Sequence, residues 1–142
     1  MTAPSTEALL AARRIYEAWD EALGNKDLDA SMRLYAEDAT LESPLVRNLL
    51  GTHEGVIEGR ENLRAFVAKV FERTPPARRR HRRGFFTDGT TLMWEYPRRT
   101  PDGEQIDLVE TMELKNGLIQ HHRVYWGWFG TKILEEDAYR RR

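Results

Sequence analysis

Apolar and polar residues alternate along residues 106–128, and this alternation predicts two strands joined by a tight turn at Asn116-Gly117. In the first strand every second residue is apolar, as in a strand that buries one face. The apolar set consists of Ile106, Leu108, Met112 and Leu114. Glu110 interrupts this set, because it places a carboxylate on the apolar face. A buried charge without a partner is costly, so we expect Glu110 to be paired, protonated or exposed to a cavity.

Apolar residues at helical spacing predict three helices in the first half of the chain. The first covers residues 6–24, with Ser5 or Thr6 as its N-cap and Gly24-Asn25 at its end. A shorter helix follows the N-cap Asp27, and we expect its apolar side to extend to Tyr35. The third has apolar residues at i, i+3, i+4, i+7 and i+8 and ends before two prolines. These residues are Leu63, Phe66, Val67, Val70 and Phe71, with Pro75-Pro76 after them.

The remaining segments read as strands and loops. Residues 39–44 predict a short strand that Pro44 ends, and residues 45–59, which contain three glycines, predict a long loop. Strands are expected over residues 78–86 and 90–98, with turns at residues 88–89 and 101–103. Helices come first and antiparallel strands last, which indicates an α+β fold. Residues 131–142 predict a charged tail.

Composition and charge narrow the classes of function. The chain has 142 residues, with 22 basic and 23 acidic side chains, which argues against a polyelectrolyte partner along the whole surface. It has no cysteine, which excludes disulfides, thiolate metal sites and cysteine nucleophiles. No apolar run reaches 18 residues, so no membrane partner is expected. We expect a single cytoplasmic domain over residues 1–142, with its core in residues 6–130.

No metal or cofactor is expected either. His121 and His122 are adjacent and point to opposite faces of a strand, which is poor geometry for two ligands of one ion. Phosphate loops and dinucleotide-binding motifs are absent. We therefore expect any chemistry to be carried by the side chains alone.

Several local strings resemble those of a known superfamily. They are Lys26-Asp27-Leu28-Asp29-Ala30, residues 34–40 (LYAEDAT) followed by Ser43-Pro44, Gly59-Arg60-Glu61-Asn62-Leu63, and residues 115–119 (KNGLI). Together they resemble the nuclear transport factor 2-like superfamily, and within it the SnoaL-like domains. The resemblance implies a cone-shaped α+β fold, in which a strongly curved antiparallel sheet wraps around N-terminal helices and leaves a cavity. Such domains include polyketide cyclases, ketosteroid isomerases, epoxide hydrolases, dehydratases and non-catalytic binding proteins.

The resemblance also assigns three positions by comparison with the ketosteroid isomerases. The tyrosine that donates to the substrate oxygen corresponds to Trp19, and the aspartate that shuttles the proton corresponds to Ser43. The second acid corresponds to Glu110. An indole can still donate one hydrogen bond, whereas a serine is a poor base without activation. The resemblance therefore argues against steroid isomerisation by the family's own residues.

The partner of Glu110 depends on the turn of the hairpin. A two-residue type I′ turn at Asn116-Gly117 places Glu110 opposite Arg123, whereas a three-residue loop with a bulge at Gly117 places it opposite His122. The resemblance favours the second register. That register directs four side chains of the returning strand inward: Gln120, Val124, Trp126 and Trp128. The outward residues would then include Val109, Ile119 and Tyr125, which suggests an interface.

We therefore predict Glu110 and His122 as the catalytic pair, because burial and mutual charge can poise one of them near neutral pH. The predicted substrate-binding residues are Tyr16, Trp19, Tyr35, Ser43, Phe66, Met112, Gln120, Val124 and Trp126. The expected activity is cofactor-independent isomerase, cyclase or hydratase chemistry on a small apolar or aromatic molecule, in a homodimer. The alternative is a non-catalytic binding or scaffold protein in which Glu110 and His122 form a structural pair.

Two further features of the sequence stay open. The basic run at residues 78–83 (RRRHRR) could bind nucleic acid or another anion, but its charges divide between two faces and no aromatic residues alternate with them. We favour an exposed strand that resists aggregation and expect no nucleic acid partner. Glu95 joins Glu110 if Met93 faces inward, and it is solvated if Trp94 and Tyr96 do, which we favour.

Overall fold

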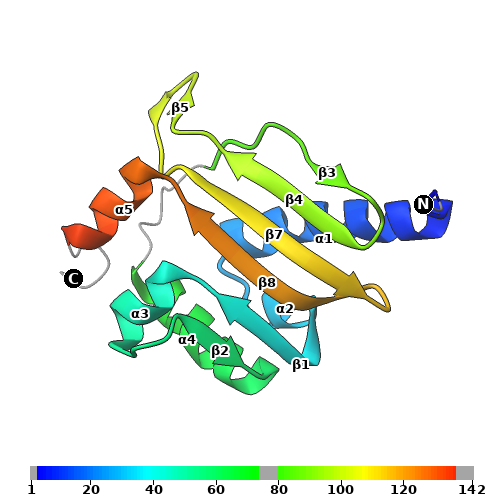
Figure 1. Cartoon of the computed structure of the whole chain (residues 1–142), viewed down its shortest axis with the longest axis horizontal. Helices are drawn as coiled ribbons and strands as arrows, with labels where there is room; N and C mark the ends of the chain where they lie inside the picture. The colour runs from blue at the N-terminus through cyan, green and yellow to red at the C-terminus, as the bar shows by residue number, and fades with distance from the viewer. Residues whose placement is uncertain (1–2, 74–79, 137–142) are drawn as a thin grey trace.

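The computed structural model describes residues 3–73 and 80–136 of the chain. The helices in these residues are α1 (Thr6–Gly24), α2 (Leu28–Met32), α3 (Pro44–Leu50), α4 (Arg60–Arg73) and α5 (Trp128–Glu135). The strands are β1 (Tyr35–Glu42), β2 (Val56–Glu58), β3 (Phe86–Thr87), β4 (Thr91–Tyr96), β5 (Arg99–Thr100), β6 (Gly103–Glu104), β7 (Leu108–Lys115) and β8 (Leu118–Trp126). Figure 1 shows their arrangement.

Six strands form one curved sheet in the order β2-β1-β8-β7-β4-β3, and β5 pairs with β6 in a separate hairpin. This confirms the predicted α+β fold. The expectation of a wholly antiparallel sheet is wrong in one respect, because β1 and β8 run parallel. A parallel pair needs a long connection between its strands, and almost the whole remaining chain lies between these two.

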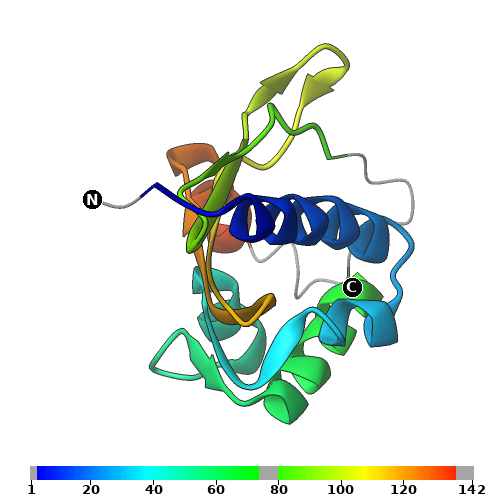
Figure 2. The ribbon, with the colours of Figure 1, turned by 90° about the vertical axis from the view of Figure 1, so that its right-hand side faces the viewer.

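The helices α1, α2 and α4 lie on one side of the sheet, as the edge-on view in Figure 2 shows. The core fills the space between them. From α1 it receives Ala12, Ile15, Trp19 and Ala22, which recur at helical spacing along one face. Within the described residues no helix is both long and apolar enough to cross a bilayer.

The caps predicted for the first two helices are confirmed. The hydroxyl of Ser5 accepts a hydrogen bond from the backbone N–H of Ala8 at 3.0 Å, and Asp27 accepts one from Ala30 at the same distance. Each bond satisfies an N–H group that the first helical turn leaves without a partner. Tyr35 does not extend the second helix, however, because it is the first residue of β1.

The loop predicted for residues 45–59 is wrong, because this segment contains α3 and β2. Ser43 is the N-cap of α3, Pro44 occupies its first turn, and Gly51 ends it with φ at +67°. Proline has no N–H to lose in a first turn, so it starts this helix as well as ending the strand before it. The glycines that suggested a loop instead mark the ends of short elements.

The β7–β8 hairpin follows neither of the two predicted registers. Asn116 and Gly117 have φ values of 54° and 75°, as a two-residue type I′ turn requires, and Lys115 pairs with Leu118. A bulge then shifts the register at Gln120, so that Glu110 stands opposite Val124. The shift preserves the predicted inward face from His122 onward.

The bulge reverses the prediction for the residues before it. Ile119 is completely buried instead of facing outward, and Gln120 donates to Asp38 of β1 in an exposed contact instead of facing inward. Trp128 is also outside, since it begins α5 and is largely exposed. Outward positions that agree with the prediction are Val109 and Tyr125, which pair with each other across β7 and β8.

The strand predicted over residues 78–86 is mostly absent, because residues 80–85 are extended without strand pairing and β3 begins at Phe86. Residues 78 and 79 and the prolines at 75 and 76 lie outside the described residues. The predicted charged tail from residue 131 is wrong in its first part, where α5 continues to Glu135. Its last residues, 137–142, lie outside the described range.

Candidate functional site

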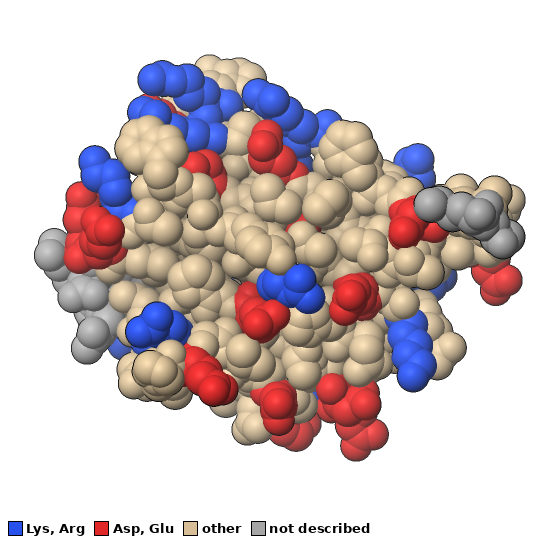
Figure 3. Space-filling view, viewed as in Figure 1, with Lys and Arg blue, Asp and Glu red and all other residues tan. Residues whose placement is uncertain are grey.

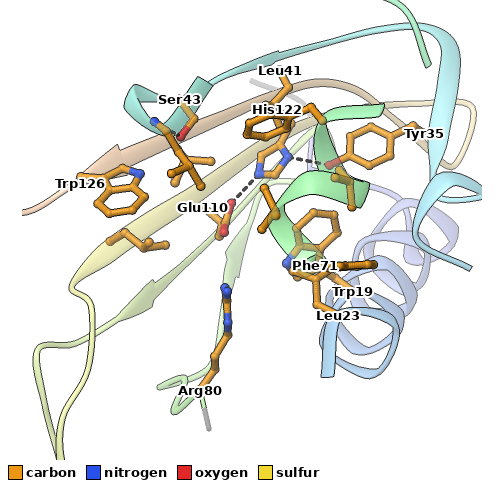
Figure 4. A pocket seen from close by; sticks show the side chains of 16 residues that line it. Trp19, Leu23, Tyr35, Leu41, Ser43, Phe71, Arg80, Glu110, His122 and Trp126 are labelled. Atoms are coloured by element: carbon orange, nitrogen blue, oxygen red, sulfur yellow. Dashed lines mark hydrogen bonds and ion pairs between the residues drawn. The ribbon is translucent and has the colours of Figure 1, made fainter. Parts of the chain in front are cut away.

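A cavity of about 80 Å³ lies between the sheet and the helices that cover it. Its walls come from α1, β1, the start of α3, α4, β7 and β8, together with Arg80 from the segment before β3 (Figure 4). Most of the lining is apolar: Leu23, Leu41, Leu45, Val67, Val70, Phe71, Leu108, Val124 and Trp126 join Trp19, Tyr35 and Phe66. The polar groups are therefore few, and each one has a defined position.

Three of these polar groups form a buried chain. The hydroxyl of Tyr35 lies 2.8 Å from Nδ1 of His122, and Nε2 of His122 bonds to Oε2 of Glu110. Figure 4 shows this chain running from β1 through β8 to β7. Glu110 is 4% exposed and His122 is 1% exposed, so the contact between them is almost fully shielded from bulk water. Shielding strengthens both hydrogen bonds relative to the same bonds in water.

The directions of the two hydrogen bonds depend on the tautomer of His122. The neutral tautomer with its proton on Nε2 donates to the Glu110 carboxylate and accepts at Nδ1 from the O–H of Tyr35. Burial raises the pKa of Tyr35 well above its ordinary value, and the charge of Glu110 adds to that increase. The phenol therefore keeps the proton that it donates. Among the described residues, Oε1 of Glu110 makes no hydrogen bond, so it remains available to a ligand.

Trp19 supplies a donor to the same cavity. Its ring meets the His122 ring edge-on, with centroids 5.0 Å apart and planes at 88°. Trp19 is 4% exposed, and its Nε1–H has no hydrogen-bond partner among the described residues. Figure 4 shows this nitrogen on the side of the ring that faces the cavity. A buried donor without a partner costs about 1–3 kcal/mol, which an acceptor on a ligand would recover.

Arg80 lies across the cavity from the sheet, with its side chain directed toward Glu110 (Figure 4). Its guanidinium carbon is 5.6 Å from the centre of the Tyr96 ring. The prediction for the basic run is therefore wrong at this residue, because Arg80 lines a cavity instead of covering an exposed strand. Residues 80–83 alternate between half-buried and exposed positions, and such alternation is the sequence signal that could have identified Arg80 as an inward residue.

The two neighbouring arginines in the run have structural partners. Arg82 lies 3.6 Å from the centre of the Tyr16 ring, donates to the backbone oxygen of Tyr16 at 2.8 Å and pairs with Asp20 at 3.5 Å. Arg83 points outward and pairs with Glu95 at 3.7 Å. Glu95 is therefore on the solvent side, as predicted, and Trp94 and Tyr96 are buried.

The cavity brings together most of the residues that the sequence predicted for it, namely Trp19, Tyr35, Ser43, Phe66, Glu110, His122, Val124 and Trp126. Three predicted residues do not line it. Tyr16 packs against Phe85 and Trp94, Met112 is completely buried in the core, and Gln120 turns outward at the bulge. Tyr16 is one helical turn from Trp19 on α1, so spacing alone could not separate a core position from a cavity position.

Ser43 has a structural task in addition to its place in the lining. Its hydroxyl oxygen accepts from the backbone N–H of Leu45 at 3.2 Å and caps α3. It has no basic partner among the hydrogen bonds of the described residues, so nothing activates it as a nucleophile or base. Among the polar side chains of the lining, Glu110 therefore remains the candidate for proton transfer.

A second polar cluster occupies the outer face of the sheet. Glu42 accepts from Arg123 at 3.0 Å and contacts His121 at 3.1 Å, and His121 also contacts Thr40. His121 and His122 therefore belong to opposite faces of β8. Across residues 3–73 and 80–136, no group of three or more His, Asp or Glu side chains is placed to hold a metal ion.

Comparison with known proteins gives one family match. The sequence profile of the SnoaL-like domain matches residues 12–122, which is most of the chain. A search of curated proteins gives no match.

Several solved structures share the fold at low sequence identity. A SnoaL-like protein of unknown function from Burkholderia thailandensis is 16% identical with a TM-score of 0.72, covering 89% of this chain and 99% of its own. The epoxide hydrolase/cyclase-like enzyme SalBIII, associated with pyran ring formation in the polyether salinomycin, is 22% identical with a TM-score of 0.60, covering 82% and 91%. A putative ketosteroid isomerase from Kribbella flavida is 18% identical with a TM-score of 0.59, covering 82% and 78%.

Proposed function

The chain belongs to the SnoaL-like domain family, and we propose that it is an enzyme that transfers a proton on a small apolar molecule without a cofactor. The observation that carries this proposal is the state of Glu110. One of its carboxylate oxygens is held by His122, while the other makes no hydrogen bond among the described residues and belongs to a residue that lines the cavity. Abstraction of a proton from carbon requires a base that is held in a fixed orientation and has an oxygen without a hydrogen-bond partner.

The proposed step moves one proton between substrate and enzyme. Oε1 of Glu110 accepts a proton from an acidic C–H, and the electron pair of that bond moves into an adjacent carbonyl to give an enolate. The enolate oxygen accepts a hydrogen bond from Nε1–H of Trp19. Return of the proton from Glu110 to another carbon completes an isomerisation, whereas attack of the enolate carbon on an internal carbonyl completes a cyclisation once the new alkoxide takes the proton from Glu110.

His122 and Tyr35 act as positioning residues in this proposal. His122 fixes the rotamer of Glu110, and Tyr35 fixes the tautomer of His122. General acid–base catalysis of this kind contributes roughly 10² to 10⁴ in rate. Such a contribution is sufficient for substrates whose C–H is already activated by a carbonyl group. The neighbours named as a cyclase-like enzyme and a putative ketosteroid isomerase support this reaction class.

The test follows deuterium exchange into small cyclic enones and β-diketones in D₂O, which reports proton abstraction without knowledge of the natural substrate. We expect the native protein to accelerate exchange and Glu110→Gln to lose most of that acceleration, by about 10²-fold. Glu113→Gln is the matched control, because Glu113 lies on the same strand with its side chain exposed. Exchange that persists in folded Glu110→Gln protein would exclude Glu110 as the base.

A second candidate function is non-catalytic binding in the same cavity. The closed chain from Tyr35 through His122 to Glu110 favours it, since every proton in the chain already has a partner within the protein. In that case the native protein binds small apolar ligands, and neither it nor Glu110→Gln accelerates exchange.

We also propose a homodimer that forms through the outer face of the sheet. Met93 and Tyr125 lie on strands of this face and are 38% and 52% exposed. Uncharged side chains cover much of this face, several charged side chains lie near its centre, and Lys and Arg gather over the β5–β6 hairpin (Figure 3). Light scattering coupled to gel filtration should give twice the mass of one chain, and Tyr125→Glu should give the monomer. A monomeric native protein excludes this interface.

A further inference from the structure

Arg80 is the one residue of the cavity lining whose charge is positive, and within the described chain no carboxylate pairs with it. Within the described residues, its guanidinium lies over the ring of Tyr96 in a cation–π contact. The next two arginines of the same run differ in this respect, since Arg82 pairs with Asp20 and Arg83 pairs with Glu95. Arg80 is half-buried, and a partly desolvated guanidinium gains stability when an anion is supplied to it.

The cavity has a second unsatisfied donor close by. Nε1–H of Trp19 is buried without a partner, and Figure 4 shows it and the Arg80 guanidinium directed toward the space in front of Glu110. The side chain of Trp19 is far more than nine-tenths buried, so bulk water does not satisfy it. Because the proposed step assigns the Trp19 donor to the enolate oxygen, the Arg80 guanidinium is the donor left for a second acceptor group of the ligand.

The charges on the two sides of the cavity are opposite in sign. Burial raises the pKa of Tyr96, the charge of Glu110 adds to this increase, and the charge of Arg80 opposes it. Both charged groups therefore act on the space around the Tyr96 hydroxyl. A ligand with one anionic end and one reactive apolar end would match this polarity.

We propose that Arg80 determines specificity by pairing with a carboxylate of the ligand, so that the cavity takes small apolar carboxylic acids. The carboxylate lies against Arg80, and the apolar body fills the space bounded by residues such as Leu108, Val124 and Phe71. This inference rests on the proposed function, because it assigns the substrate class of the same site. The carboxylate is the anchor, and the activated C–H of the substrate is at a different carbon, near Glu110.

Cavity size limits the length of such an acid. About 80 Å³ is space for roughly five to eight water-sized groups. A short aliphatic acid therefore fits, whereas a fused ring system does not. Pentanoate and its neutral amide, pentanamide, are a matched pair of probes that differ in charge and hardly in shape.

The test measures the affinity of both probes by NMR titration of the native protein and of Arg80→Gln. We expect pentanoate to bind the native protein more tightly than pentanamide, and Arg80→Gln to weaken pentanoate by about 10- to 100-fold while leaving pentanamide unchanged. Arg80→Lys should retain part of the preference, since it keeps the charge but not the fork of donors. Arg83→Gln is the matched control, because Arg83 belongs to the same run but faces solvent.

The outcomes separate this inference from the proposed catalysis. Equal affinity of the native protein for pentanoate and pentanamide would contradict a carboxylate site at Arg80, whether or not any variant folds. An undiminished preference of Arg80→Gln for pentanoate would contradict it as well. Glu110→Gln should bind pentanoate at least as tightly as the native protein, because it removes a negative charge near the ligand. Failure of the exchange assay together with a preserved Arg80-dependent preference would leave a binding protein for small acids.

Discussion

Replacement of His122 by leucine is the most direct way to test the buried chain in the cavity. Leucine is close to histidine in volume, so the packing against Trp19 is largely retained while both hydrogen bonds of the imidazole are lost. Glu110 then remains buried at 4% exposure without its partner, and the hydroxyl of Tyr35 also loses its acceptor. We therefore expect a large loss of stability from a single conservative change in size.

The size of the loss follows from the two groups left behind. A buried carboxylate that loses its hydrogen-bond donor becomes an uncompensated charge, which costs about 3–5 kcal/mol, and an unsatisfied buried hydroxyl adds about 1–3 kcal/mol. The sum of roughly 4–8 kcal/mol is comparable with the total free energy of unfolding of a typical domain, which is about 5–15 kcal/mol. His122→Leu should thus be marginally stable at neutral pH.

A second change should restore much of that stability. Glu110→Met replaces the stranded carboxylate by an apolar side chain of similar length, so the double variant Glu110→Met/His122→Leu leaves only the Tyr35 hydroxyl unsatisfied. We expect the double variant to be less stable than the native protein by about 1–3 kcal/mol, and clearly more stable than His122→Leu alone. It should also show no deuterium exchange activity, which separates stability from function.

The assay is urea unfolding followed by tryptophan fluorescence at constant pH, with the two single variants and the double variant compared as a cycle. Equal m values across the set would show that the variants unfold from comparable native states. The reasoning is refuted if the double variant is as unstable as the sum of the single losses, because additivity would mean that Glu110 and His122 are not coupled.

Two further predictions concern ionisation and the backbone. Burial raises the pKa of Tyr35 and Tyr96, so above about pH 10 the unfolded chain loses protons that the folded chain keeps, and the free energy of unfolding should fall by about 1.4 kcal/mol per pH unit for each tyrosine. Urea unfolding at a series of pH values above about 10 gives the dependence of the free energy of unfolding on pH. This dependence should be weaker in Tyr35→Phe by the contribution of one tyrosine, and an unchanged dependence would contradict the assignment. Gly117→Ala should cost about 1–2 kcal/mol, because alanine is strained at φ of 75°, whereas Gly24→Ala should stabilise α1 by roughly 0.5–1 kcal/mol in an open position. Thermal unfolding of both variants checks this pair, and equal effects of the two changes would refute the conformational argument.

The sequence predicted α1, α2, α4 and the inward face of the last strand because these depend on periodicity. Trp19 and Glu110 lie in the cavity as periodicity and the family resemblance indicated, and the caps at Ser5 and Asp27 follow from local chemistry. The helix α3 was missed because a proline was read only as the end of a strand, although the same residue suits the first turn of a helix.

The partner of Glu110 in the sheet was missed for a different reason. A bulge adds one residue to a strand without changing its composition, so neither hydrophobic pattern nor turn type reveals it. Both registers considered for the hairpin were uniform along its length, whereas the actual register changes at Gln120. Arg80 was missed because five of the six residues at 78–83 are arginines, and only the packing of Arg82 on α1 shows which side is inward.

The bulge at Gln120 divides β8 into a short part that packs in the core and a longer part that lines the cavity. Between the turn and the bulge, β8 contributes core residues such as Ile119, and beyond it the strand contributes the cavity residues that begin at His122. Without Gln120 the side chains of β8 would alternate regularly along its whole length, so either the hairpin tip or the Glu110–His122 pair would have to leave its present position. A change in register at the hairpin tip can be compensated at the bulge, so that the pairing beyond the bulge is kept. The sequence of the tip is therefore free to vary while His122 and the residues after it keep their positions in the cavity wall.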